Sequence, residues 1–410
     1  MTDRRPDGAI PEKLDPGEIA SLALSPSRPK RQRIFPVLES LAYFDHAAIT
    51  PLPSPVARAI GAHTHDVEHF GSANWGAWTQ RIERTRRSAA ALLSVVPERI
   101  AFVKNTTAGI NAVAGGFPWK EGDSVVVQAG DFPSNVFPWV ALEARGVRVR
   151  RVGRTPGHSI GPGEILEAAD STTRLVALCL VAYDDGFRFP VEEVAQKANS
   201  RGIFVLVDAI QGLGAIPFDA SLPGIDAVTA DGHKWLLGPE GAGILALSPR
   251  LLEILDVSEP GWMNIAHPPG SFQTDRLEWV DGAKRFEGGS LNTAGYSGLG
   301  ASLDLIEAVG IREIWKALES LTALLRERLA SRGHEVVSSV RDGQRSGIVS
   351  FRARGQSNSH RIAKSLMGMG IQISARQGFL RAAPHFYLDS SDLDRLTEGL
   401  ETALQKSGGR

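Results

Sequence analysis

The sequence predicts an α/β fold built on a mostly parallel sheet, followed by a smaller α+β domain. From about residue 98, short apolar runs alternate with helical segments, which is typical of repeated strand–helix–strand units. Runs such as "IFVLV" at 203–207 are apolar at every position, as expected of a parallel strand buried on both faces. Beyond residue 300, long amphipathic helices alternate with only a few strand-like runs. These three observations favour a doubly wound large domain with a second, smaller domain behind it.

The predicted elements follow in chain order. In the first part, strands are expected at 99–105, 123–128, 147–152, 174–183, 202–209, 225–231 and 241–247, with helices at 108–117, 135–146 and 190–202. In the second part, helices are expected at 311–333 and 392–404, and strands at 346–353, 370–376 and 379–387. We divide the chain into a polar lead-in (1–35), a large domain (36–300) and a small domain (301–410). Ligands of such an open sheet bind beyond the carboxyl ends of its strands.

The composition of the chain excludes several classes of function and site. The chain has 410 residues, 42% of them hydrophobic and 22% charged, as in an ordinary globular protein. Its formal net charge of −1 shows none of the excess positive charge typical of proteins that bind nucleic acid. No apolar run approaches the roughly 20 residues that a membrane-spanning helix needs. The N-terminus lacks the apolar core of a signal peptide, so we expect a cytoplasmic protein. The single cysteine, Cys179, excludes a disulfide framework and a cysteine-based metal site.

An acid and a lysine follow two successive strands. Asp208 comes directly after "IFVLV", and Lys234 follows the next strand in "DGHKWLLGPEGAG". Because both strands end at the same edge of the sheet, both side chains can reach one crevice. There they could simply pair with each other, since a buried carboxylate needs a cation nearby.

Other residues favour a ligand site over a mere ion pair. In "NTTAGIN", Thr106 and Thr107 stand at a strand-to-helix junction, where free N–H groups bind anions, although either threonine could merely cap the helix. Phe132 also follows a strand and could stack on a ring, although most such aromatic residues are core. An anion cradle, a stacking ring, an acid and an amine are together what pyridoxal 5′-phosphate requires.

The chain resembles the class V aminotransferases, a branch of the fold-type I pyridoxal phosphate enzymes that includes cysteine desulfurases, selenocysteine lyases, kynureninases and isopenicillin N epimerase-like proteins. The resemblance runs from "YFDHAAITPLP" to "HFYLDSSDLDRL" and is carried by "NTTAGIN", "DFPSNVFPW", "VDAIQGLGAIPFD", "DGHKWLLGPEG", "FEGGSLN" and "RAAPHFY" in the family's order. It implies a mostly parallel seven-stranded sheet flanked by helices, an amino-acid substrate and a homodimer.

The resemblance also implies roles for individual residues. Lys234 would form the Schiff base and then move the substrate's α-proton, and Asp208 would keep the pyridine nitrogen protonated. The other cofactor contacts implied are His233, Thr106 and Thr107 at the phosphate, Gln211 at the ring's phenolic oxygen, Phe132 over the ring face and Ser290 at the phosphate of the neighbouring subunit. The substrate contacts implied are Arg381 at the carboxylate, with Arg376 as a second candidate and His46 at the border of the site.

Two departures from the family's pattern bear on the reaction. Asp231 stands where many relatives carry a hydroxyl residue, and we expect its carboxylate to turn away from the phosphate. The stretch between Arg376 and Arg381 is only "QGFL" and has no cysteine, while Cys179 lies within an apolar strand. A persulfide mechanism is therefore disfavoured. Transamination, racemisation and β- or γ-elimination all proceed through the same α-carbanion and stay open, including a C–S or C–Se lyase reaction without a persulfide cysteine.

Two alternatives of other classes remain. "HDVEH" places His65, Glu68 and His69 in the H-x-x-E-H pattern of inverted zinc proteases, which would make the protein a zinc metallohydrolase. This alternative leaves the α/β pattern around Lys234 unexplained. The chain could also bind the cofactor without turnover and act as a regulator, although the retained Lys234, Asp208 and Arg381 argue against this.

Overall fold

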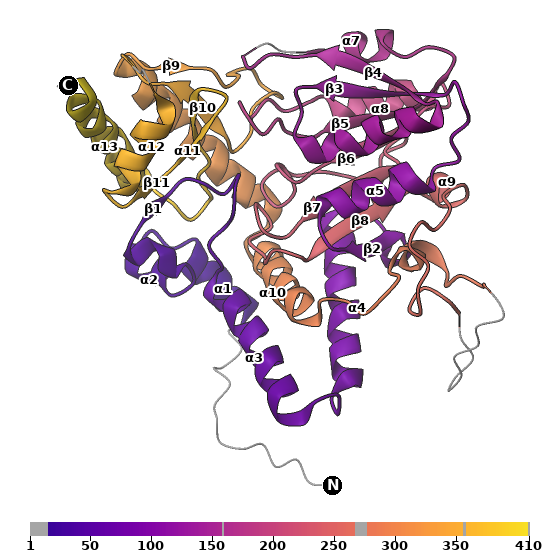
Figure 1. The fold of residues 1–410 in the computed structure, drawn as a ribbon. Helices are drawn as coiled ribbons and strands as arrows, with labels where there is room; N and C mark the ends of the chain where they lie inside the picture. The colour runs from indigo at the N-terminus through magenta and orange to yellow at the C-terminus, as the bar shows by residue number, and fades with distance from the viewer. Residues whose placement is uncertain (1–14, 158–159, 267–276, 356–357, 409–410) are drawn as a thin grey trace.

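A seven-stranded sheet forms the centre of the computed structural model, which describes residues 15–157, 160–266, 277–355 and 358–408. The strand order is β2-β8-β7-β6-β5-β3-β4. Its strands are β2 (Ile100–Val103), β3 (Ser124–Ala129), β4 (Arg148–Gly153), β5 (Thr173–Cys179), β6 (Phe204–Asp208), β7 (Ala227–Asp231) and β8 (Gly243–Leu247). Neighbours from β7 to β4 pair in parallel, whereas β8 is antiparallel to β2 and β7. The mostly parallel seven-stranded sheet is confirmed (Figure 1).

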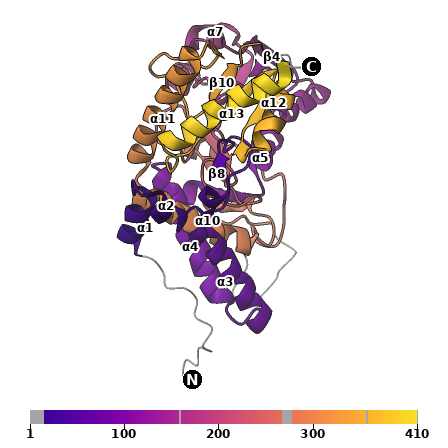
Figure 2. The same cartoon turned by 90° about the vertical axis from the view of Figure 1, so that its left-hand side faces the viewer.

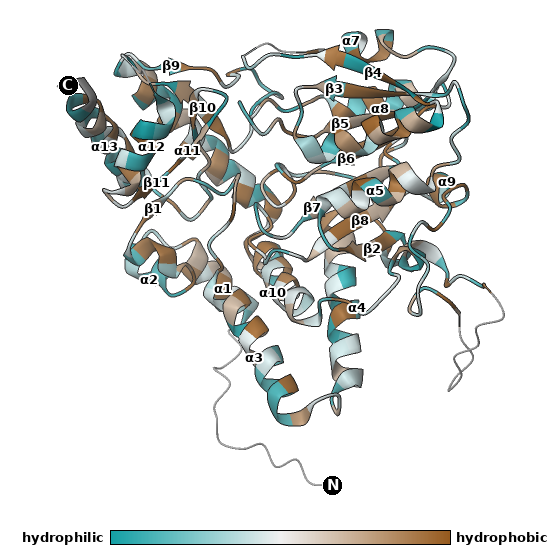
Figure 3. Ribbon diagram, in the orientation of Figure 1, coloured by the Kyte–Doolittle hydropathy of each residue, from teal (hydrophilic) through white to brown (hydrophobic). Residues whose placement is uncertain are grey.

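Helices cover both faces of this sheet, and the strand sequences show why. Along β3, Val125 and Val127 belong to one apolar core while Val126 belongs to the other, because successive side chains point to opposite faces. One face is covered by α5 (Thr106–Gly116), α6 (Phe137–Val140) and α9 (Pro249–Leu252), and the other by α7 (Pro162–Glu167), α8 (Val191–Asn199) and α10 (Thr293–Val309). Hydrophobic residues accordingly gather on the central strands (Figure 3).

The helix predicted over 135–146 is only partly present. α6 covers just Phe137–Val140, and a 3₁₀ segment over Ala141–Arg145 follows it. The segment ends at Gly146, whose φ of 76° is the left-handed conformation that glycine adopts most easily.

The C-terminal part is a separate four-stranded antiparallel sheet of order β12-β13-β10-β9, packed with helices. Its strands are β9 (Glu335–Val336), β10 (Val349–Arg352), β12 (Ser374–Arg376) and β13 (Phe379–Ala382), and its helices are α11 (Ile311–Ser331), α12 (Ser359–Met367) and α13 (Ser390–Gly408). Figure 2 shows these three helices on one side of the molecule. The long helix α10 spans the predicted domain boundary at residue 300.

The predicted polar lead-in has more structure than its composition indicates. Residues 1–14 lie outside the described residues, but α1 (Pro16–Ala23) and α2 (Arg28–Gln32) follow them. Leu22 and Phe35 are buried, and the Arg28 guanidinium lies 2.8 Å from the Asp392 carboxylate of α13. β1 (Ala42–Tyr43) then pairs in parallel with β11 (Ile371–Gln372). The N-terminal segment is therefore held against the C-terminal part.

Two helices, α3 (Ser54–Phe70) and α4 (Trp75–Leu92), extend away from the sheet as a pair next to α10 (Figure 1). Across the described part of the chain, no helix combines the length and the apolar character that crossing a membrane requires.

Candidate active site

A cavity of about 440 Å³ lies at the carboxyl edge of the sheet. Each of several strands contributes a lining residue at its carboxyl end or in the segment after it: Thr106 after β2, Phe132 after β3, Tyr183 after β5, Asp208 at the end of β6 and Lys234 after β7. The β12–β13 hairpin adds Arg376 and Arg381 from the other sheet. The cavity thus lies between the two sheets, where a ligand of an α/β fold is expected.

Asp208 and Lys234 share this cavity in an environment that disfavours charge on either. Burial, reinforced by the charge of Asp131, raises the pKa of Asp208 to about 7. Burial, reinforced by the positive charges of Arg381 and Arg376, lowers the pKa of Lys234 to about 8. A buried amine of this kind is neutral often enough to act as a nucleophile or a base. A carboxyl group of this kind can ionise fully only if a further cation comes to it.

The N-terminal end of α5 forms a corner of the cavity whose hydrogen-bond donors suit an anion. Thr106 is the first residue of this helix, and its buried hydroxyl has no hydrogen-bond partner among the described residues. The Thr107 hydroxyl donates to the Ser134 hydroxyl at 2.8 Å, and both residues line the cavity. The Asn105 side chain caps the helix by accepting from the Ala108 N–H at 2.9 Å, so neither threonine is needed for this cap and the Thr106 hydroxyl is left for a ligand.

Asp231 lines the cavity, and both oxygens of its carboxylate have neighbours within the chain. One oxygen accepts the backbone N–H groups of Gly232 at 2.7 Å and Ala242 at 3.3 Å, and the other lies 2.9 Å from Nδ1 of His233. His233 lines the cavity beside this acid.

Gln211 is fixed on the cavity wall from two sides. Its side-chain oxygen accepts the Trp235 indole N–H at 2.9 Å, and its amide nitrogen donates to the Ala47 carbonyl at 2.9 Å. These two hydrogen bonds also fix the direction of the remaining N–H of the Gln211 amide, and their partners belong to distant parts of the sequence.

Arg381 is almost fully buried, 1% exposed, and held by three acceptors. Its Nε donates to the Ser374 hydroxyl at 3.2 Å, one terminal nitrogen donates to the Tyr183 carbonyl at 2.7 Å, and the other lies 3.4 Å from an Asp45 carboxylate oxygen. Arg376 is only half-buried and donates to the Ala375 carbonyl at 2.8 Å. Both guanidinium groups line the cavity that contains Lys234.

Two aromatic residues, Phe132 and Tyr183, line the cavity. The Phe132 ring lies 5.5 Å from Nζ of Lys234 and packs edge-on against Tyr183, with ring centroids 5.4 Å apart. The Tyr183 hydroxyl accepts a hydrogen bond from the Gln377 side chain at 2.9 Å. Sequence reasoning did not single out Tyr183 or Gln377, because their approach depends on how the two sheets pack.

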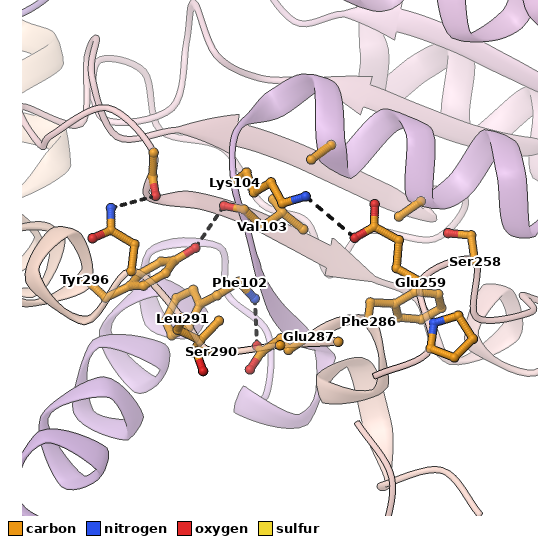
Figure 4. A pocket seen from close by; sticks show the side chains of 17 residues that line it. Phe102, Val103, Lys104, Ser258, Glu259, Phe286, Glu287, Ser290, Leu291 and Tyr296 are labelled. Carbon is orange, nitrogen blue, oxygen red and sulfur yellow. Dashed lines mark hydrogen bonds and ion pairs between the residues drawn. The ribbon is translucent and has the colours of Figure 1, made fainter. Parts of the chain in front are cut away.

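Two predicted site residues do not line this cavity. His46 is fully buried, and its two ring nitrogens lie 2.9 Å from the Ala383 carbonyl and 2.8 Å from the Tyr387 hydroxyl. Ser290 lies instead on a second cavity of about 320 Å³, next to Glu287 and Leu291 (Figure 4). Gly241 lines both cavities, so the two adjoin.

The H-x-x-E-H residues lie apart from the cavity. His65, Glu68 and His69 are exposed on α3, and their candidate ligand atoms lie within 4.8 Å of one another. None of the three lines the cavity that contains Lys234.

The residues of the cavity fit pyridoxal phosphate. The unpartnered Thr106 hydroxyl and the free end of α5 suit a phosphate group, the raised pKa of Asp208 suits a partner with a protonated ring nitrogen, and Lys234 offers an amine near both. This fit to pyridoxal phosphate rests on the hydrogen-bond donors and the charged groups of the cavity residues.

Comparisons with known proteins agree with this geometry. The family model described as aminotransferase class-V matches residues 42–390. A probable cysteine desulfurase of Methanothermobacter thermautotrophicus is 34% identical, with 90% of this chain and 96% of that protein covered. A cysteine desulfurase of Cronobacter sakazakii is 30% identical over 89% of this chain and 95% of its own.

Solved structures of similar fold include two of C-DES. One is a lysine-to-alanine mutant with glycine covalently linked to the pyridoxal phosphate cofactor, 25% identical with a TM-score of 0.84 over 90% of this chain and 98% of that one. The other is a complex of the cystine C–S lyase C-DES with its reaction product, cysteine persulfide, 26% identical with a TM-score of 0.81 over 89% and 98% of the two chains.

Proposed function

We propose a reaction for this chain from one premise: the chain belongs to the class V aminotransferase family. It is a pyridoxal phosphate-dependent enzyme. We propose that it is a C–S lyase that cleaves an L-cysteine derivative by β-elimination and does not pass the sulfur to a cysteine of its own. The observation that carries this proposal is a cavity with the family's lysine and acid but with no thiol in its own lining, since Cys179 borders only an adjoining void of about 10 Å³ that is too small for a substrate.

The only thiol of the chain is badly placed to accept sulfur. Cys179 is the last residue of β5, where it pairs in register with Asp208 of β6. Its sulfur lies 3.4 Å from the Gln128 side-chain oxygen, and burial together with the Asp131 charge raises the pKa of the thiol well above its ordinary value. A protonated, immobile thiol is neither a nucleophile nor a carrier.

The hairpin between Arg376 and Arg381 supports the same conclusion. β12 and β13 are joined by Gln377 and Gly378 alone, with φ angles of 51° and 83°. A two-residue turn of this kind is the tightest connection between antiparallel strands. It has no room for a mobile loop that could deliver a thiol to the substrate.

The site residues would hold the cofactor in the roles expected from the sequence. Thr106, Thr107 and His233 would bind its phosphate, and the Lys234 amine would attach it covalently. Phe132 would cover one face of the ring, and Asp208 would pair with the ring nitrogen. Gln211, held by Trp235 and Ala47, would donate to the phenolic oxygen.

Bound pyridoxal phosphate supplies an electron sink that stabilises negative charge at the substrate's α-carbon. The chain supplies orientation and proton transfer. Arg381 would bind the α-carboxylate, and the Lys234 amine would take the α-proton. The Cβ–S bond would then break with its electron pair leaving on sulfur, and the proton held by Lys234 would pass to this sulfur to give a thiol. The released aminoacrylate would react with water to give pyruvate and ammonium, so Lys234 is restored and atoms and charge balance without an oxidant.

The proposal also includes a homodimer whose sites lie at the subunit interface. Ser290 is exposed on a loop next to the Lys234 cavity, and Gly241 is common to the two cavities. The partner subunit's Ser290 would then contact the phosphate. A molar mass near twice 44.0 kDa in light scattering supports this arrangement, and a monomer with full cofactor affinity contradicts it.

The test of the reaction combines a spectrum with a product assay. Purified protein is expected to show a visible cofactor band that borohydride removes, and K234A is expected to fold but to lose both the covalent attachment and turnover. Cysteine derivatives should then yield pyruvate in equimolar amount with the thiol. A stable pyridoxamine form instead of pyruvate would refute elimination in favour of transamination, and unchanged turnover in K234A would refute the assignment of Lys234.

A further inference from the structure

Three side chains with metal-binding atoms lie together on α3, outside the site that the proposed function uses. His65, Glu68 and His69 belong to the last two turns of this helix, which runs away from the central sheet toward its junction with α4 (Figure 1). Residues three and four positions apart share a helix face, so the helical backbone itself brings the three side chains together. Their candidate ligand atoms all lie within 4.8 Å of one another.

The spacing within this group is close to the spacing of ligands around a metal ion. Nδ1 of His65 lies 4.0 Å from a Glu68 carboxylate oxygen, and the ring centroids of His65 and His69 are 4.0 Å apart. Two ligands of a tetrahedral zinc ion, each about 2.1 Å from the metal, are about 3.4 Å from each other. All three side chains are exposed, so small rotations about their side-chain bonds would bring the ligand atoms to this spacing.

The hydrogen bond of His69 prepares its ring to bind a metal. Nδ1 of His69 lies 2.9 Å from the main-chain carbonyl oxygen of His65. A carbonyl oxygen only accepts, so Nδ1 carries the proton and donates it, and the lone pair of the neutral ring is on Nε2. Metal-binding histidines commonly donate their other ring N–H to a backbone carbonyl in this way, which fixes both the tautomer and the ring orientation.

The charges around the group favour a cation. Among the described residues, the Glu68 carboxylate has the two histidines as its ion-pair neighbours within 4.0 Å, and no lysine or arginine. Glu68 and His69 also lie in the last turn of α3, which ends at Phe70, where the free main-chain carbonyl groups carry partial negative charge. A carboxylate at this end of a helix is unfavourable by itself, and a bound cation would offset both charges.

We propose that His65, Glu68 and His69 form a binding site for one divalent transition-metal ion per chain. Two imidazole nitrogens and one carboxylate oxygen suit Zn²⁺, Ni²⁺ or Cu²⁺, whereas Mg²⁺ and Ca²⁺ prefer oxygen ligands alone. Water would fill the remaining coordination positions, because the side chains are exposed. None of the three lines the Lys234 cavity or the Ser290 cavity, so this site is separate from the pyridoxal phosphate site.

The test measures zinc binding to untagged, cofactor-bound protein by equilibrium dialysis in the presence of excess Mg²⁺, with the metal counted by mass spectrometry. The wild type is expected to bind one zinc ion per chain in a saturable way. H65Q and H69Q should each lower the zinc affinity at least about 10-fold, because losing even a hydrogen-bond partner of a metal ligand costs about 10–100-fold. Exposed positions tolerate these substitutions, and circular dichroism checks that both variants fold.

H360Q is the matched control, because His360 is an exposed histidine on another helix, α12. It should keep the zinc affinity of the wild type. K234A should keep it too, so the outcome does not depend on the proposed reaction. The inference is overturned if the wild type shows no saturable zinc binding, if H65Q and H69Q bind zinc as tightly as the wild type, or if H360Q or K234A lowers the affinity as much as they do.

Discussion

Replacing Asp208 by asparagine is expected to stabilise the cofactor-free protein and to abolish its function. Asp208 is 3% exposed, and its pKa is raised from 3.8 to about 7. At 1.36 kcal/mol per pKa unit, this interval corresponds to about 4 kcal/mol. Because the pKa of Asp208 is higher in the folded than in the unfolded protein, the free energy of unfolding falls by this amount as pH rises from about 4 to about 7, and the loss is complete above pH 7. D208N removes the ionisation and keeps an acceptor for the Ile210 N–H at 3.0 Å.

The assay is urea unfolding of cofactor-stripped protein at pH 5 and pH 8. D208N should exceed the wild type by up to about 4 kcal/mol at pH 8 and by clearly less at pH 5. The same variant should bind pyridoxal phosphate more weakly and lose turnover, because an amide cannot balance a protonated ring nitrogen. D342N is the control, since Asp342 is 92% exposed in its side chain and its surface ion pair with Arg345 contributes about 0–1 kcal/mol.

Two results would refute this reasoning. If D208N were less stable than the wild type at pH 8, the ionised Asp208 carboxylate would stabilise the cofactor-free protein, contrary to the destabilisation that its burial predicts. If D208N kept full turnover, the ring nitrogen would not depend on this acid, and the role expected from its place at the end of β6 would be wrong.

Three further predictions follow from buried groups. C179A should keep full turnover, because no sulfur passes through this thiol; loss of turnover with an intact fold would reinstate an enzyme persulfide. E287Q should lower the free energy of unfolding in urea by about 3–5 kcal/mol, because it weakens the buried ion pair of Glu287 with Arg86, whose N···O distances are 2.5 and 3.0 Å. E83Q changes the more exposed partner of Arg86 and should cost about 1 kcal/mol or less. Equal losses in the two variants would contradict the argument from burial. Burial lowers the pKa of His385 to about 4, so stability of up to about 3 kcal/mol should be lost as pH falls from 6.5 to 4, and H385Q should flatten this profile; an unchanged slope would assign the acid loss to other groups.

The sequence by itself determined the central sheet and the chemical groups at its edge. Apart from the arginine-rich edge strand β4, each strand from β2 to β8 is a short, mainly apolar run whose pattern is local, so it could be found without knowledge of its neighbours. Lys234 and Asp208 follow two such runs, and the rule that ligands bind beyond the carboxyl ends of strands brought them together. The Thr106–Thr107 pair at the start of α5 was recognisable for the same reason.

Only the tertiary structure decided which distant residues meet this edge. Gln377 and Arg381 reach Tyr183 because the hairpin of one sheet packs against the other, and nothing in the spacing of about 190 residues predicts these contacts. The pairing of Asp231 with His233 depends on the backbone amides of Gly232 and Ala242, since these orient the carboxylate. Local periodicity reports which face of an element is apolar, whereas the partner of that face is chosen by packing over the whole chain.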